Sequence, residues 1–206
     1  CQGYDKPHYT NVQMPFPGEP PEVPENNPTG IYRRKFKIPA TWANRRVVVH
    51  FGGAESVLYV WVNGEPLGFS KDSRLPTEFD ITPHLVSGEN TLVAAVVRWS
   101  DSTYIEDQDH WFMAGLHREV YLYSTPLVHV ADLKIQAEFD PNTNQGHLSL
   151  EVEISFHCAV KPGYTVQAQL HAHSGKPVKE GPCQADVHMA GNPYLYRGHR
   201  VHILQE

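Results

Sequence analysis

Acidic and aromatic residues gather in one short stretch of this 206-residue chain. Four carboxylates and three aromatic rings lie within residues 101–111: Asp101, Tyr104, Glu106, Asp107, Asp109, His110 and Trp111. Aromatic rings stack on the apolar faces of sugars, and carboxylates accept hydrogen bonds from hydroxyl groups. The mixture therefore suits a carbohydrate, and it equally suits a cation, because carboxylates are hard oxygen ligands. A solvated acidic loop with buried tryptophan anchors is the structural alternative.

A second polar segment covers residues 71–81 (KDSRLPTEFDI). Its charged side chains predict a salt-bridged loop between two strands, with a structural rather than a catalytic role: Lys71, Asp72, Arg74, Glu78 and Asp80.

Histidine is frequent, with 13 residues. His171 and His173 alternate and are expected to share one strand face, with His188, His199 and His202 downstream. Zinc uses such ligands, but no close pair with a matching second pair is evident, which favours scattered surface histidines. Nucleophile elbows, Walker loops and dinucleotide glycine fingerprints are also absent, and spacing identifies no acid/base carboxylate pair.

Short runs of β-branched and aromatic residues predict the elements that position these groups. In the first half they are residues 31–38, 46–51, 56–62, 90–98 and 119–123. Asn63-Gly64 follows the third run and is a strong hairpin signal. A strand-entry turn at Gly30 would use the positive φ that glycine allows.

The chain divides into two predicted domains at Thr125-Pro126. A Pro-dense segment that should run extended over a surface opens the first domain, 1–126, and a second series of strand-like runs fills 127–206: 130–139, 146–156, 164–173 and 200–204. Turn residues separate these runs without a helical period of ten or more residues, which indicates an all-β protein of antiparallel sandwiches. The second domain has fewer residues than the ~100 of an immunoglobulin-type sandwich, so we expect it to be compressed or incomplete.

Composition narrows the class of partner. Lys and Arg number 17 against 23 Asp and Glu, a net charge of −6, and no basic cluster occurs, so nucleic acid is not an expected partner. No run approaches the ~18 apolar residues of a membrane span. The first residues lack the features of a signal peptide. Cys1, Cys158 and Cys183 are too scattered for a disulfide framework, which favours free thiols in a reducing compartment.

Several of these segments resemble the N-terminal part of a large β-galactosidase of glycoside hydrolase family 2, of the enterobacterial type. The matching motifs are GYDKPHYTNV (3–12), NPTGIY (27–32), DSRLPTEFDI (72–81) and RWSDSTYIEDQDHWFMAGLHREVYL (98–122). The resemblance is strong over residues 3–126 and weaker beyond, where NPYLY (192–196) is similar to the end of the family's second domain.

The resemblance implies a sugar-binding jelly-roll domain, then an immunoglobulin-like β-sandwich, then a catalytic (β/α)8 barrel. It also implies that Asn11 lines the substrate cleft and that Asp101 meets the galactosyl 6-hydroxyl and a bound sodium ion. Magnesium belongs to the parent enzyme, and its ligands are absent from this sequence. The implied partners are a galactoside substrate, the parent's barrel and three further copies in a homotetramer, and the implied location is cytoplasmic.

Retaining hydrolysis of a galactoside needs two carboxyl groups about 5–5.5 Å apart, and the family's two catalytic glutamates fall in the barrel, outside this sequence. We therefore expect the chain to be inactive alone, as a non-catalytic portion of a β-galactosidase. A free-standing carbohydrate-binding module is the alternative, with exposed aromatics among Tyr104, Trp111 and Phe112 as its binding groups. A third possibility is a structural or truncated product that aggregates through exposed apolar surface.

Overall fold

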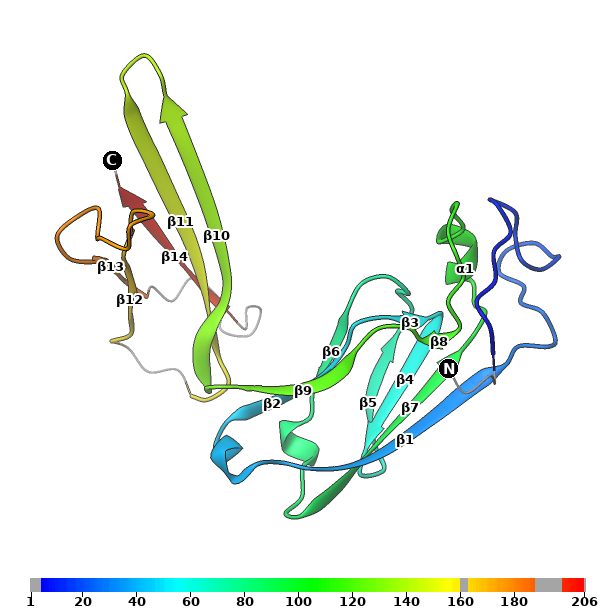
Figure 1. Cartoon of the computed structure of the whole chain (residues 1–206). Coiled ribbons are helices and arrows are strands. Elements are labelled where there is room, and N and C mark those ends of the chain that lie inside the picture. Colours follow the sequence, from blue (N-terminus) through cyan, green and yellow to red (C-terminus); the bar gives the residue numbers. More distant parts are fainter. Residues whose placement is uncertain (1–4, 160–162, 188–197, 206) are drawn as a thin grey trace. The chain divides into compact units, whose positions relative to one another are not determined.

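The computed structural model describes residues 5–159, 163–187 and 198–205. The chain forms two compact units, Cys1–Ser124 and Thr125–Glu206, which are described separately (Figure 1). Both units are built from β-strands, as the sequence predicts.

Two sheets make up the first unit. A four-stranded antiparallel sheet has the order β1-β7-β4-β5, and a three-stranded sheet has the order β6-β2-β9. The strands are β1 (Thr29–Lys37), β2 (Arg46–Phe51), β4 (Val57–Val62), β5 (Glu65–Ser70), β6 (Thr77–Asp80), β7 (Glu89–Val97) and β9 (Val120–Thr125). A short pair, β3 (Ala54–Glu55) and β8 (Gly115–Leu116), and three single-turn helices complete the unit: Ala40–Trp42, Thr82–His84 and α1 (Ser102–Ile105).

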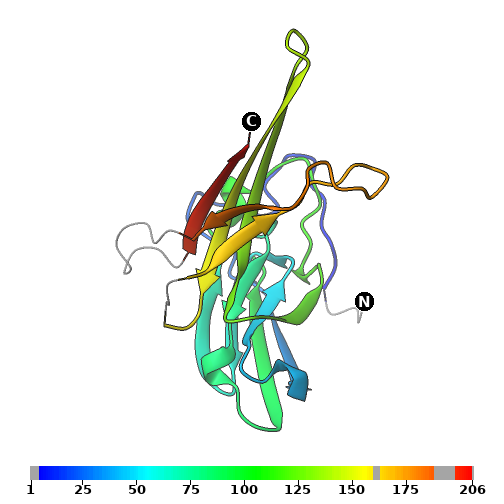
Figure 2. The same ribbon diagram turned by 90° about the vertical axis from the view of Figure 1, so that its left-hand side faces the viewer.

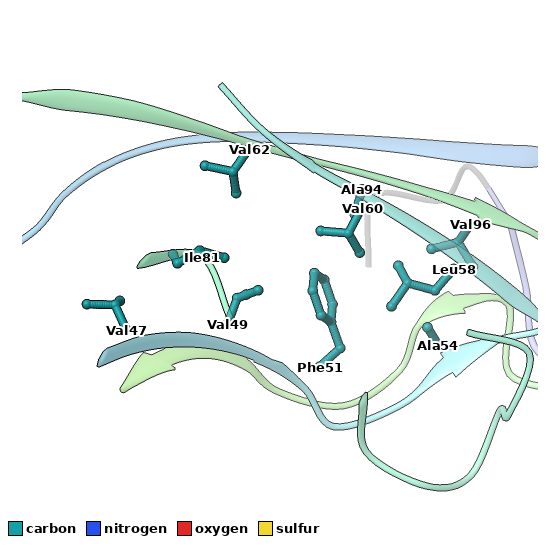
Figure 3. Close-up of a cluster of buried hydrophobic side chains, with 10 residues drawn as sticks. All are labelled: Val47, Val49, Phe51, Ala54, Leu58, Val60, Val62, Ile81, Ala94 and Val96. Atoms are coloured by element: carbon teal, nitrogen blue, oxygen red, sulfur yellow. The ribbon is translucent and has the colours of Figure 1, made fainter. Parts of the chain in front are cut away.

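The core lies between the two sheets of this unit. Alternate residues of β4 point inward, so Leu58 and Val60 are buried while Tyr59 is exposed. They meet Val49 and Phe51 from β2, and Figure 3 shows the two sets of side chains pointing toward one another. Ten buried apolar residues form this cluster, which holds the sheets together through the hydrophobic effect.

The backbone conformation predicted from the sequence is correct at Gly64 and wrong at Gly30. Asn63-Gly64 joins β4 to β5 with positive φ angles of 54° and 90°, which confirms the hairpin. The expected positive φ at Gly30 is wrong, because Gly30 lies inside β1 opposite Val96. Its lack of a side chain serves packing instead, since a Cβ there would lie 3.0 Å from the Tyr32 ring.

The described residues of the second unit form five strands. β10 (Val128–Asp140), β11 (Gln145–Phe156) and β14 (Gly198–Gln205) form an antiparallel sheet, and β12 (Thr165–Ala168) pairs with β13 (Cys183–Asp186). Val152 and Ile154 of β11 form a small core with side chains of β12 and β13. The long yellow-green hairpin β10–β11 reaches beyond the other strands of its unit in both views (Figures 1 and 2). Whether this unit is immunoglobulin-like stays a prediction.

One strand and the histidines on it differ from expectation. The predicted run 164–173 forms a strand only at Thr165–Ala168, so His171 and His173 do not share a strand face. A turn follows the strand: His171 and Pro177 form an isolated antiparallel β-bridge, and His171 Nδ1 lies 3.0 Å from the Gly175 carbonyl oxygen. His188 lies outside the described residues, as do the side chains of His199 and His202. Cys158 and Cys183 are free thiols, and Cys1 also lies outside the described part.

Candidate functional site

Four segments of the first unit meet at one end of the four-stranded sheet. Strand register shows this directly, because Val97 at the end of β7 lies opposite both Thr29 at the start of β1 and Val57 at the start of β4. Ser70 at the end of β5 lies opposite Leu58. The segments leaving these strand ends are the Pro-rich segment 5–28, residues 55–56, the loop 71–76 and the loop 98–114. We call this region the loop end.

Arg74 ties the segments of the loop end together. Its guanidinium group lies 3.5 Å from Glu55 Oε1 and donates to the Trp111 carbonyl oxygen at 3.0 Å and to His110 Nδ1 at 2.9 Å. The Glu55 side chain is only 5% exposed, and its other oxygen accepts a hydrogen bond from the Met113 amide. Burial raises the pKa of Glu55, while Arg74 and the Met113 amide oppose that rise. Glu55 is thus a buried anchor for two loops.

A second set of bonds fixes the same loops. Glu106 accepts from the Ser73 amide at 2.8 Å and from the Ser73 hydroxyl at 2.6 Å. His110 accepts from Arg74 at Nδ1, so its Nε2–H donates to the Glu106 carbonyl oxygen at 2.7 Å. His117 Nε2 lies 2.8 Å from the Ser73 carbonyl oxygen, and burial lowers the pKa of His117. These charged and polar groups act as a frame for the loop end.

The Pro-rich segment contributes Phe16 to an aromatic cluster with Trp99 and Phe112. The Phe16 and Trp99 ring centroids lie 5.3 Å apart. The Trp99 and Phe112 ring centroids lie 5.6 Å apart. Asn27 holds the segment by accepting from the Trp99 amide at 2.9 Å and donating to the Trp99 carbonyl oxygen at 2.8 Å. The described residues 5–28 contain no helix or strand longer than an isolated bridge, which fits their proline content.

Asp101 is the N-cap residue of α1, four residues after the end of β7. Its Oδ1 lies 2.5 Å from Lys71 Nζ and accepts from the Ser102 amide at 3.0 Å, while the side chain remains 49% exposed. The hydrogen bond from Lys71 lowers the pKa of Asp101, so the group is an exposed carboxylate held in its charged form.

Asn11 belongs to an exposed polar and aromatic group on the same end. Tyr9 donates its hydroxyl to Asp109 at 2.6 Å and lies 3.4 Å from Asn11 Oδ1. The Tyr9 ring stacks on Trp111 with centroids 5.4 Å apart, and Trp111 is 56% exposed. The hydrogen bond to Asp109 raises the pKa of Tyr9. A ring face, an amide and a carboxylate thus lie close together and accessible to solvent.

Several expectations about this region change with the structure. Phe112 is buried at 2% exposure and Tyr104 donates its hydroxyl to the Glu22 carbonyl oxygen, so only Trp111 of the three aromatics presents an exposed face. Lys71, Arg74 and Asp80 of segment 71–81 form ion pairs with residues outside it, while Asp72 accepts from the amides of Arg74 and Leu75 inside it. Thr77–Asp80 is strand β6 rather than loop. The sequence alone does not identify Glu55, because this residue lies between the predicted strands 46–51 and 56–62 and no motif there marks a buried carboxylate.

No group of three or more His, Cys, Asp or Glu side chains suited to a metal occurs among the described residues. Asp101 offers one carboxylate, and the adjacent Lys71 ammonium repels a cation. The described residues alone therefore do not fit a sodium or magnesium ion. The described part of the chain also has no helix long and apolar enough to cross a membrane.

The residues of the loop end match a known protein family. Residues 1–126, which contain the whole loop end, match the model of the glycosyl hydrolases family 2, sugar binding domain. The chain belongs to glycosyl hydrolase family 2. This membership confirms the resemblance drawn from the motifs and implies a jelly-roll arrangement for the first unit.

Curated relatives in this family are named β-galactosidases. The chain is 45% identical over 177 residues to one from Psychromonas ingrahamii, covering 86% of this chain and 17% of that protein. It is 45% identical over 170 residues to one from Pectobacterium atrosepticum, covering 82% of this chain and 16% of that protein. A relative from Priestia megaterium is 42% identical over 90% of this chain and 19% of its own length. The chain thus spans less than one fifth of these relatives.

Solved structures show the same fold at low identity. A β-glucuronidase from Bacteroides uniformis superposes with a TM-score of 0.70 at 20% identity, over 87% of this chain and 22% of its own. A putative β-galactosidase from Bacteroides fragilis gives a TM-score of 0.68 at 18% identity, over 96% of this chain and 30% of its own.

Proposed function

We propose that this family 2 chain is the N-terminal, non-catalytic portion of a β-galactosidase and that its loop end shapes the galactoside-binding cleft. The supporting observation is that Asp101, Asn11 and Trp111 lie in segments converging at one end of the sandwich, on a frame fixed by Arg74 and Glu55. A rigid frame under exposed polar groups is what a pre-organised binding surface needs.

Each exposed group has a role in this proposal. The charged carboxylate of Asp101 accepts hydrogen bonds from a galactosyl hydroxyl, with Lys71 holding its orientation. Asn11 lines the cleft wall through its amide. The parent's catalytic barrel supplies both carboxyl groups of retaining hydrolysis and closes the cleft from the other side. Sodium binding through Asp101 would need further ligands from outside the described residues. Assembly as a homotetramer, magnesium in the parent and a cytoplasmic location belong to the same proposal.

Hydrolysis of a chromogenic β-galactoside by the purified 206-residue chain, with sodium and magnesium present, tests the non-catalytic assignment. We expect no turnover above a buffer control. Turnover that disappears when one of the chain's own carboxylates is changed to its amide would show that the chain carries a catalytic pair, and the assignment would be wrong.

The role of Asp101 is tested with the chain joined to the remainder of a β-galactosidase. Asp101→Asn keeps the shape but removes the charge, and we expect kcat/KM for a galactoside to fall at least about tenfold, since hydrogen bonds to charged groups contribute ~1.5–3 kcal/mol. Asp132→Asn, an exposed carboxylate of the second unit, is the matched control. Equal kinetics for both variants would remove Asp101 from the cleft.

A free-standing carbohydrate-binding module is the second candidate, favoured by the exposed Tyr9–Trp111 stack. It predicts measurable galactose binding by the chain alone in a calorimetric titration. Trp111→Ala should abolish that binding, whereas Phe69→Ala, an exposed aromatic on β5, should not. Absence of any heat of binding at millimolar galactose would leave only the first proposal.

A further inference from the structure

The outer face of the three-stranded sheet in the first unit carries a hollow. Alternate residues of β2 point to opposite faces, and because Val49 and Phe51 enter the core, His50 lies on the outer face. Gly52 directly follows β2, and a hollow of about 420 Å³ lies beside it. Its lining residues are His50, Gly52, Pro76, Arg118, Glu119 and Tyr121. We call it the Gly52 hollow, and its volume suits one small molecule.

Neighbouring side chains fix the His50 ring in the wall of the Gly52 hollow. Its Nδ1 lies 2.8 Å from Glu78 Oε1, and the ring stacks on Tyr121 with centroids 4.4 Å apart. The second Glu78 oxygen accepts from the Tyr123 hydroxyl at 2.8 Å. Because a carboxylate only accepts, Nδ1 of His50 carries a proton, and Nε2 is the ring nitrogen left for a ligand.

An arginine and a glutamate bring opposite charges to the hollow. Arg118 Nη1 donates to the Arg74 carbonyl oxygen at 2.6 Å and to the Gly52 carbonyl oxygen at 3.3 Å, which holds the guanidinium group in place. The Glu119 carbonyl oxygen accepts from the Gly52 amide at 2.9 Å. In the described ranges neither Arg118 nor Glu119 is part of an ion pair. Both charges are therefore available to a ligand, and together they sum to zero.

Two further residues add apolar surface that solvent can reach. Tyr121 is 45% exposed, and Pro76 is exposed as well. The hollow thus combines an aromatic ring, a proline ring, a carboxylate, a guanidinium group and an imidazole nitrogen. This set offers apolar contact together with both hydrogen-bond donors and acceptors.

We propose that the Gly52 hollow binds one neutral sugar ring. The apolar face of the sugar would pack on Tyr121 and Pro76, while its hydroxyl groups donate to Glu119 and accept from Arg118. A ligand of either charge would meet a like charge in the hollow, which favours a neutral one. None of the lining residues is among the groups assigned to the galactoside cleft, so this site does not depend on the proposed function.

Nuclear magnetic resonance of the 15N-labelled 206-residue chain tests the proposal. The probes are glucose, glucuronate, glucosamine in its charged form, and cyclohexanol, which has a six-membered ring with a single hydroxyl. We expect glucose to shift the amide resonances of Gly52, Glu119 and Tyr121 and to bind at least about fivefold more tightly than each other probe. The charged sugars meet a like charge, and cyclohexanol lacks most of the hydroxyl groups. Cellobiose, in which the same ring ends a longer sugar, binds as tightly as glucose if the hollow takes a terminal unit and more weakly if it takes a free monosaccharide.

A charge-removing variant locates the binding. Glu119→Gln changes an exposed side chain and leaves Arg118 without an opposite charge in the hollow. Glucose should then bind at least about fivefold more weakly, since a neutral amide accepts hydrogen bonds less strongly than a carboxylate, and glucuronate should bind more tightly than it binds the unsubstituted chain. Glu65→Gln, an exposed glutamate of β5, is the matched control and should change neither affinity.

Four results would overturn the proposal. Equal affinity for cyclohexanol and glucose would show that the hydroxyl groups are not recognised. Tighter binding of either charged sugar than of glucose to the unsubstituted chain would show an ion site instead. Resonance shifts confined to Trp111 and its neighbours would place the sugar at the loop end. Unshifted amides at Gly52, Glu119 and Tyr121 in hundreds of millimolar glucose would show that the hollow binds no sugar.

Discussion

The buried Glu55 and the half-buried Arg74 hold the loops of the candidate site in place although neither residue is itself a proposed binding group. Arg74 donates hydrogen bonds to the carbonyl oxygen of Trp111 and to the ring of His110, and Glu55 accepts one from the amide of Met113. The two residues therefore fix both ends of segment 110–113. Removing one partner of a buried ion pair leaves the other uncompensated, which costs far more than the pair contributes.

Arg74→Ala should therefore lower the free energy of unfolding of the first unit by about 3–5 kcal/mol, because Glu55 stays buried without its counter-charge. The measurement is urea unfolding followed by tryptophan fluorescence. Arg33→Ala, an exposed arginine on β1, is the control and should change stability by less than about 0.5 kcal/mol. Equal effects of the two substitutions would contradict the role of Arg74 as a frame residue.

The raised pKa of Glu55 gives a pH prediction with a definite sign. Because the folded state holds this proton more tightly than the unfolded state, stability from Glu55 is fully present below its usual value of 4.5 and is lost as pH rises through the folded pKa. Glu55→Gln removes this dependence. We expect the stability of Glu55→Gln relative to the parent chain to increase as pH rises from 4.5 toward neutrality. Parallel stability curves for the two proteins would refute the prediction.

The close approach of Tyr32 in β1 to strand β8 depends on Gly115. Gly115 has φ of 77°, and a Cβ on it would collide with the Tyr32 hydroxyl, which also approaches the Leu116 amide at 3.4 Å. The first residue of β8 thus needs both the left-handed conformation and the missing side chain.

Gly115→Ala should destabilise the first unit clearly more than Gly64→Ala. Gly64 also has a positive φ, 90°, but nothing lies within 4 Å of its Cβ position, so it reports backbone strain alone, about 1 kcal/mol. Thermal unfolding of both variants separates strain from collision. Identical melting temperatures would mean that Tyr32 moves aside at no cost.

The molecule as a whole presents an apolar face on β10 of the second unit. Leu133, Ile135 and Phe139 alternate along this strand and are 48%, 59% and 64% exposed. An exposed apolar patch of this kind favours association.

We expect the 206-residue chain to elute from a sizing column at an apparent mass that increases with concentration. Ile135→Thr combined with Phe139→Thr should shift elution toward the monomer, since the patch loses its two most exposed side chains. Lys134→Thr, on the opposite face of β10, is the control. Elution independent of concentration for the unsubstituted chain would show that this face does not associate.

Local chemistry along the sequence determined the strands, the Asn63-Gly64 hairpin, the extended Pro-rich segment and the family, because strand alternation, turn preferences and motifs act over a few residues. It also identified the 98–111 stretch as the region where ligand chemistry concentrates. Only the tertiary structure decided that Phe112 is buried while Trp111 is exposed, that Gly30 needs space rather than a positive φ, and that Glu55 lies beneath loops at residues 74 and 113. Those outcomes depend on contacts between segments far apart in the chain, and sequence spacing carries no information about which of them meet at one end of a sheet.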